Sequence, residues 1–258
     1  MNKNYQELWK KRSLIYNFAV MDLKLRYRNS ILGFFWTILE PLLMLGVLYF
    51  VFTNIFKYEI EHYPLYILLG LILWYTFSRG TGAGLDSLIT KSGILTQINM
   101  PREVPVISTA LTSFFVLCFE LTTLGIFMAV FQFVPPATII FLPLILLLLF
   151  MFVLGITFPL SVLNIRYRDI KFVWSVTLQA GFFLTPIFYK LNILPEILQR
   201  ILYFSPMVQI IDIAHGLFLY DKLPTIEATA TAIITTTLTF VIGYTVFQKL
   251  QARIMEEL

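Results

Sequence analysis

Six long apolar runs constrain the fold more than any other feature of the chain. They cover about 31–56, 64–86, 105–133, 138–163, 172–189 and 225–247. A helix needs about 20 apolar residues to cross the hydrocarbon layer of a bilayer, and only the fifth run is short. The runs are continuously apolar and do not alternate as barrel strands do, so each predicts a spanning helix. We therefore expect an all-α integral membrane protein with six transmembrane helices in a single domain.

The composition agrees with this class. Hydrophobic residues make up 58% of the chain and charged residues only 13%, against about 25% charge in soluble proteins. The net charge of +4 comes from the loops and does not indicate a nucleic-acid partner. The single cysteine, Cys118, excludes an intrachain disulfide and a cysteine-based metal site. The first run is long and lacks a small-residue cleavage site, so we expect no cleavable signal peptide.

Basic residues predict the orientation of the helices, because cytoplasmic loops are enriched in Lys and Arg. Of the 19 such residues, a six-helix layout leaves 15 inside and only four outside, namely Lys57, Lys190, Arg200 and Lys222. We therefore expect a multi-pass membrane protein with both termini in the cytoplasm. Residues 1–30 carry apolar side chains at helical spacing, which predicts an amphipathic interface helix on the membrane surface. A plain orienting tail is the alternative.

Two connecting segments have unusual patterns. The inner segment 87–104 contains breaks at Ser92-Gly93 and Met100-Pro101, with room between them for a short helix along the membrane. The outer segment 190–224 is strongly apolar, yet prolines divide it into pieces too short to span a bilayer. Because proline suits the first turn of a helix, we expect two short re-entrant helices at about 195–204 and 206–219.

Three charged residues inside the predicted spans are candidate functional groups. Glu40 lies about 14 Å into the first span, and Arg79 lies about 10 Å from the inner end of the second. Their similar depth favours a Glu40–Arg79 pair or a shared polar network, although Arg79 extending alone to the headgroups is the alternative. Glu120 has no evident partner in the sequence. We expect its carboxyl group to be satisfied structurally and not to relay protons.

No pattern predicts catalysis or a nucleotide site in this chain. The glycine cluster Arg79–Ser87 lacks the third glycine of a dinucleotide fingerprint, and no Gly-Lys-Ser/Thr phosphate loop occurs. Gly80 and Gly84 instead predict close packing of helices. No group of His, Asp and Glu has the spacing of metal ligands. Aromatic residues make up 16% of the chain, and their flat rings suit either lipid contact or sliding contact with sugar rings.

Five stretches of the sequence occur in the order of a known family. They are RYRNSILGFFWTILEPL (Arg26–Leu42), NMPREVPVI (Asn99–Ile107), NIRYRDIKFVW (Asn164–Trp174), FFLTPIFY (Phe182–Tyr189) and YFSPMVQIIDIAHGLFLY (Tyr203–Tyr220). Together they resemble the membrane subunit of bacterial ABC exporters of lipid-linked polysaccharides, such as O-antigen, capsule and wall teichoic acid. The resemblance spans nearly the whole chain. One departure is Ser205, where the family more often has Asn.

The resemblance implies a homodimer of this subunit bound to two copies of a separate cytoplasmic ABC ATPase. That partner would hold ATP and Mg²⁺, so we expect no catalytic residue, cofactor or metal in this chain. The residues implied in ATPase coupling are Lys91, Asn99, Arg102, Glu103, Arg26 and Arg28. Those implied in a glycan channel are Phe35, Trp36, Glu40, Trp174, Phe182 and Phe183. The helices at Pro195 and Pro206 would form an outer gate.

Arg166 and Arg168 are candidates for contact with the ATPase or with the lipid phosphate, and a plain positive-inside role is the alternative. The chain as a whole is predicted to be the permease of an ATP-driven exporter of a lipid-linked polysaccharide. A self-sufficient channel or secondary transporter would need polar groups near the bilayer midplane and repeated halves, which the sequence hardly shows. A membrane enzyme acting on lipid-linked sugars would need clustered acids or histidines, which the sequence lacks.

Overall fold

The computed structural model describes residues 11–28, 30–57, 60–97 and 100–251. Within these ranges the chain is helical and contains no strand, which confirms the predicted all-α class. The α-helices are α2 (Arg12–Tyr27), α3 (Trp36–Phe50), α4 (Tyr63–Leu85), α5 (Ser87–Thr90), α6 (Ser92–Gln97), α7 (Glu103–Val130), α8 (Leu142–Arg166), α9 (Ile170–Leu184), α10 (Glu196–Tyr203), α11 (Pro206–Leu219) and α12 (Ile226–Gln251). Three short 3₁₀ helices are η1 (Gly33–Phe35), η3 (Ala137–Phe141) and η4 (Leu191–Ile193), and η2 (Val51–Ile55) is a π-helix that follows α3.

Among the described residues, four helical stretches are long and apolar enough to cross a membrane. They are Gly33–Ile55, Glu103–Val130, Ala137–Arg166 and Ile226–Gln251. The helices α10 and α11, bent by 95° relative to each other, would add a fifth only as one broken span. Helix α4 is 23 residues long but is not among these four, and α9 has only 15 residues. The structure therefore supports a multi-pass membrane protein, and the count of six spans stays a prediction.

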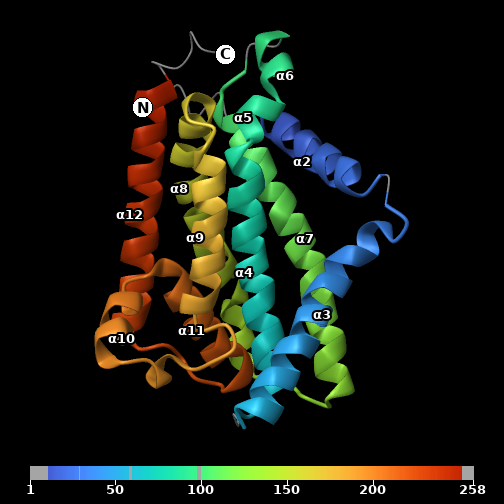
Figure 1. Ribbon diagram of the computed structural model, residues 1–258, viewed down its shortest axis with the longest axis vertical. Coiled ribbons are helices and arrows are strands. Elements are labelled where there is room, and N and C mark those ends of the chain that lie inside the picture. The colour runs from blue at the N-terminus through green and yellow to red at the C-terminus, as the bar shows by residue number, and fades with distance from the viewer. Residues whose placement is uncertain (1–10, 29, 58–59, 98–99, 252–258) are drawn as a thin grey trace.

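Helix α4 lies at the centre of the bundle, with α7 and α8 against it (Figure 1). Its side chains at Ile67, Leu68, Leu71 and Ile72 have no exposed surface. Leu69 and Leu73 on the other side of the helix are equally buried, as expected for a helix that is apolar all round and is surrounded by other helices. The core of the protein is therefore built around α4.

Small residues set the distance between α4 and α8. A Cβ atom on Gly84 would lie 2.2 Å from Cγ2 of Thr157, and one on Gly80 would lie 2.7 Å from Cγ1 of Val153. Both distances are well below the van der Waals optimum of about 3.5–4.0 Å between carbon atoms. The two backbones approach this closely only because both side chains are absent, which confirms the predicted packing role of the glycines.

Helices α2 and α3 form an arm on one side of the bundle (Figure 1). Helix α2 packs against α7 and buries Phe18 and Ala19, so the predicted amphipathic helix directs part of its apolar face into the protein. Helix α3 contacts α4 and α7. It continues through Pro41 to Phe50, so the Glu-Pro pair interrupts the apolar sequence without ending the helix.

Helices α10 and α11 lie at the end of the bundle opposite α5 and α6 (Figure 1). Pro195 precedes α10 as its N-cap residue, and Pro206 is the first residue of α11, as the sequence predicts. Helix α11 packs against α4, α8 and α12 and buries most of its apolar side chains. Two short bent helices therefore occupy this segment, and their role as a gate stays a prediction.

Candidate functional site

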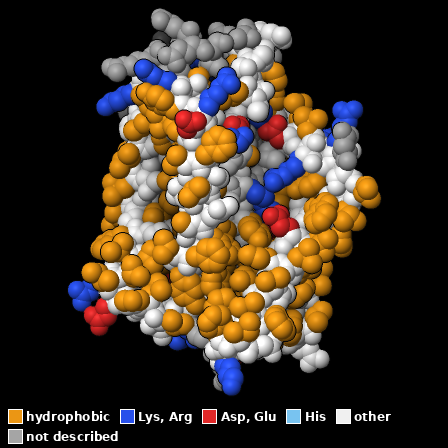
Figure 2. Space-filling model, viewed as in Figure 1, with side chains coloured by type: hydrophobic (Ala, Val, Ile, Leu, Met, Phe, Trp, Pro, Cys, Tyr) orange, Lys and Arg blue, Asp and Glu red, His pale blue; other side chains and the backbone are white. Residues whose placement is uncertain are grey.

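A groove opens between the end of α2, the start of α3 and the middle of α4. Its volume is about 670 Å³. Figure 2 shows acidic and basic side chains in a recess on this face, surrounded by apolar side chains. The residues that line the groove are Arg26, Tyr27, Ser30, Trp36, Thr37, Glu40, Leu43, Met44, Val47 and Tyr75. The end near α2 is therefore polar, and the wall along α3 becomes apolar with distance from α2.

Arg79 connects three helices behind this groove. Its Nη2 atom lies 2.5 and 2.6 Å from the two carboxylate oxygens of Glu120, which is fully buried on α7. Its Nη1 atom lies 3.7 Å from Oε2 of Glu40, a side chain that is 53% exposed. The guanidinium carbon lies 5.7 Å from the centre of the Tyr75 ring. The predicted shared polar network is therefore present, and Glu120 is its closer acid.

Arg26 differs from Arg79 in its surroundings. It is exposed in the last turn of α2, and its guanidinium carbon lies 6.0 Å from the centre of the Tyr27 ring. Within the part of the chain that the structure describes, no carboxylate forms an ion pair with it. Burial raises the pKa of the Tyr27 hydroxyl, so this group stays neutral and able to donate a hydrogen bond. An available cation and a neutral hydroxyl therefore lie together at the polar end of the groove.

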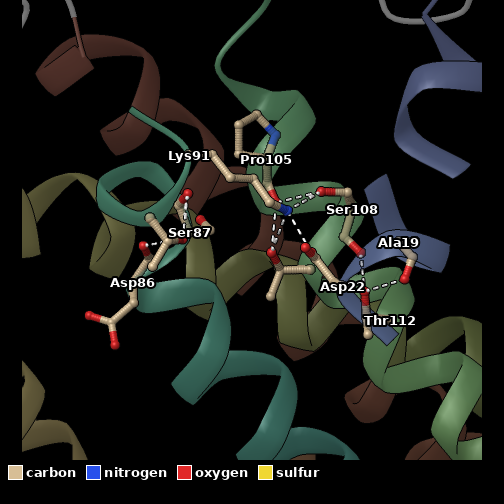
Figure 3. A network of polar contacts seen from close by, with 10 residues as sticks. Ala19, Asp22, Asp86, Ser87, Lys91, Pro105, Ser108 and Thr112 are labelled. Carbon is tan, nitrogen blue, oxygen red and sulfur yellow. Dashed lines mark hydrogen bonds and ion pairs between the residues drawn. The ribbon is translucent and has the colours of Figure 1, made fainter. Parts of the chain in front are cut away.

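Lys91 joins the segment between α5 and α6 to α2 and α7 (Figure 3). Its Nζ atom lies 2.6 Å from Oδ2 of Asp22 on α2 and 3.0 Å from Oγ of Ser108 on α7. Thr112 of α7 adds a hydrogen bond of 3.2 Å to the carbonyl of Ala19. Lys91 is only 7% exposed. Its ammonium group therefore faces the interior and holds α2 in place. The role of Lys91 in ATPase coupling stays a prediction, and such a role would act through this contact with α2.

Apolar side chains also connect α2 to the start of α7. Phe18 of α2 packs in one cluster with Met100 and Val104, and side chains of α6 pack against that cluster. Helix α2, the segment before α7 and the first turn of α7 therefore form one packed unit.

Arg102 and Glu103 connect the start of α7 to the end of α12. Arg102 donates a hydrogen bond of 3.0 Å to the carbonyl of Gln251, and Gln248 donates one of 2.6 Å to Oε1 of Glu103. Partial burial lowers the pKa of Arg102, and the negative charge of Glu103 acts in the opposite direction. Their predicted coupling role is not tested by this geometry. Asn99, predicted for the same role, lies outside the described residues.

The predicted pathway residues fall into two groups. Phe35, Trp36, Glu40 and Phe183 are exposed, as a pathway requires. Phe182 is 7% exposed in the core, and Trp174 donates its indole hydrogen to Thr81 over 3.1 Å. A pathway role for all six stays a prediction. The remaining predicted contact residues, Arg28, Arg166 and Arg168, are exposed and do not line the groove.

Two residues of this region were not predicted from the sequence. Asp22 follows Phe18 by one helical turn, so the helical spacing of the apolar residues could have placed it on the buried face of α2. Tyr75 lies one turn before Arg79 and forms part of the groove, which depends on the path of α3 and has no local signal. Contacts between distant segments of this kind are not encoded in any short pattern.

A bundle of long apolar helices with a bent pair of short helices and a polar groove suits a multi-pass membrane protein, and comparison with known proteins identifies the family. Residues 15–219 match the ABC-2 type transporter family, so the chain belongs to this family. Over 86% of its length the chain is 31% identical to an O-antigen export system permease protein, RfbA, of Myxococcus xanthus, of which it also covers 86%. It is 28% identical to an RfbA protein of the same description from Klebsiella pneumoniae, over 91% of each chain.

Proposed function

We propose that the chain is the membrane-spanning permease of an ATP-driven exporter that moves a lipid-linked polysaccharide, of O-antigen or teichoic acid type, to the outer side of the bacterial plasma membrane. The observation that carries the proposal is membership of the ABC-2 transporter family together with the similarity to O-antigen export permeases over most of the chain. The exposed aromatic residues beside the groove are consistent with a glycan substrate, because aromatic faces bury large area without demanding a fixed hydrogen-bond pattern.

The energy source in this proposal is a separate ABC ATPase. Two permease copies pair as a homodimer and bind two ATPase copies, which hold the ATP and Mg²⁺. The candidate dimer face includes exposed apolar side chains of η1, α3 and α9, namely Phe35, Leu43, Val47, Phe172, Val176 and Phe183. Apolar surface of this kind faces either lipid or a second subunit.

The proposed topology has six spans, with α4 and α9 included, and both termini in the cytoplasm. The α5–α6 end of the bundle then faces the ATPase. The bent pair α10 and α11 lies toward the outer side, where it would gate the exit of the glycan.

The proposal is tested by purification and reconstitution with the candidate ATPase. The full chain should copurify with a separately encoded ABC ATPase, and the pair in proteoliposomes should export a lipid-linked glycan only when ATP is added. If the purified chain moved the glycan without an ATPase, the self-sufficient channel would be the better account.

A further inference from the structure

We propose that Tyr66 and His215 are positioning residues that tie the end of α9 and the helix α11 to one turn of α4. These three segments then move as one body during transport, and α10 moves against them. The role in transport rests on the proposed export function, whereas the fixing of α11 is a property of the chain alone.

Two tyrosines at the start of α4 hold the break that follows α9. Residues 185–189 are not helical, so their carbonyl oxygens lack the partners that a helix would supply. The hydroxyl of Tyr63 donates a hydrogen bond of 2.8 Å to the carbonyl of Phe188, and that of Tyr66 donates one of 3.0 Å to the carbonyl of Tyr189. Both tyrosines are buried. The break is therefore fixed to α4 by two hydrogen bonds that are costly to leave unmade.

The same turn of α4 holds α11. The ring of His215 stacks on the ring of Tyr66, with 3.6 Å between the ring centres and 18° between the planes. The Nε2 atom of His215 lies 2.9 Å from the carbonyl oxygen of Tyr66. Because a carbonyl oxygen only accepts, Nε2 carries the hydrogen and donates it. His215 is 3% exposed, so this contact is shielded from water. Tyr66 therefore contacts α11 through its ring and carbonyl, and the break after α9 through its hydroxyl.

Helices α10 and α11 differ in how they are held. Helix α11 packs against α4, α8 and α12, and the carbonyl of Leu217 accepts a further hydrogen bond of 2.7 Å from Thr138. No residue of α10 is buried, and Ile197 and Ile201 are 69% and 63% exposed. A helix with few buried apolar contacts opens at a low cost in free energy. We therefore expect α10 to move while α11 stays in place.

The joint between the two helices is the bend of 95°. Phe204 and Ser205 separate α10 from α11, and hinges commonly lie at residues that end a helix. Gln209 of α11 donates a hydrogen bond of 2.6 Å to the carbonyl of Tyr203, so the last residue of α10 stays tethered. Helix α10 can therefore swing about this joint without displacing α11.

The first test measures backbone hydrogen exchange of the purified full chain in lipid nanodiscs, without an ATPase or a glycan. We expect α11 to be protected as strongly as α4, and α10 to exchange at least about tenfold faster. His215→Leu should speed the exchange of α11 by about tenfold, as for the loss of a buried hydrogen bond. The matched control is His62→Leu, which removes the other histidine of the chain, packed on Phe133. Equal protection of α10 and α11, or no response of α11 to His215→Leu, would overturn the proposal.

The tie to α9 has its own variant. Tyr66→Phe removes the hydroxyl that bonds Tyr189 and keeps the ring that stacks on His215. We expect faster exchange in the last turn of α9, with the protection of α11 unchanged. Unchanged exchange at the end of α9 would contradict the part of the proposal that concerns this helix.

A second test separates positioning from general stability. In proteoliposomes with the ATPase, His215→Leu should lower the amount of glycan exported per ATP hydrolysed severalfold, because α11 is no longer held. A loss of folded protein would instead lower export and hydrolysis together and leave their ratio unchanged. His215→Gln should restore most of the ratio, since its amide can donate to the carbonyl of Tyr66. An unchanged ratio in His215→Leu would contradict the positioning role. Absence of export by the unaltered chain would refute the proposed function, and the exchange measurement would still decide whether α11 is held.

Discussion

Arg79 is the residue on which the polar interior of the bundle depends. It carries a charge that is only 10% exposed, and two acids on different helices lie near it. The Nη2 atom of Arg79 bonds both carboxylate oxygens of the buried Glu120, whereas Glu40 is more distant and 53% exposed. A buried ion pair adds little to folding stability compared with apolar residues packed in the same place. Removing one partner is nevertheless destabilising, because the other charge stays buried without full compensation.

We therefore expect the two acids to behave differently when neutralised. Glu120→Gln should lower the free energy of unfolding by about 3 kcal/mol, because the charge of Arg79 then stays buried with only the more distant Glu40 as a counter-charge. Glu40→Gln should lower it by less than about 1 kcal/mol, as for an exposed pair. Denaturant unfolding of the purified chain in detergent measures both values. Equal losses would mean that Arg79 is shared evenly, contrary to the observed distances.

Gly84 gives a second prediction at the scale of single residues. Gly84→Ala should destabilise the protein by about 1–3 kcal/mol, because the new methyl group would overlap Thr157 in the α4–α8 contact. The control is Gly82→Ala on the same helix, where no atom lies within 4 Å of the new Cβ. That variant should be neutral or stabilising by up to about 1 kcal/mol through its helix propensity. The two thermal midpoints distinguish them, and a neutral Gly84→Ala would refute the close packing.

At the scale of helices, the contact of α2 with α7 and with the segment around α5 and α6 is the clearest route from that end of the bundle to the groove. Lys91 lies in the segment predicted to meet the ATPase and is bonded to Asp22 on α2, and α2 leads directly into the groove. We therefore expect a movement of this segment to displace the polar end of the groove as well.

This route makes a prediction about coupling. Lys91→Met should lower export by about fivefold or more while ATP hydrolysis by the assembled complex continues, because the coupling free energy carried by the ion pair is lost. The exchange Lys91→Asp with Asp22→Lys should restore part of the export. Lys24→Met, an exposed position of α2, serves as the control. Export that does not respond to Lys91→Met would exclude Lys91 from the route.

The sequence predicts the helices well and their contacts poorly, for a physical reason. Long apolar runs leave the backbone no alternative to a helix in lipid, and each predicted span overlaps a helix of the structure. The prolines at 195 and 206 mark the starts of α10 and α11 because proline suits a first turn. The partner of Glu120 was not predictable, since Arg79 lies 41 residues away in the chain and its position depends on the packing of α4 against α7.

At the scale of the whole molecule, the described chain forms a bundle whose two ends differ in chemistry. One end carries α5, α6 and the end of α12, which Lys91, Arg102 and Glu103 connect through α7, and the other carries the bent pair α10 and α11 (Figure 1). Between them, the polar groove lies beside an exposed apolar face. Such an arrangement fits a subunit that is driven from one end and releases its substrate at the other.

The central claim is that this chain exports a lipid-linked glycan only when a separate ATPase drives it. The most direct measurement is the transfer of a labelled lipid-linked glycan across the membrane of proteoliposomes that contain the full chain with or without its ATPase partner. We expect transfer only when the partner and hydrolysable ATP are both present. Transfer by the chain alone, or none with an assembled and ATP-hydrolysing complex, would contradict the account.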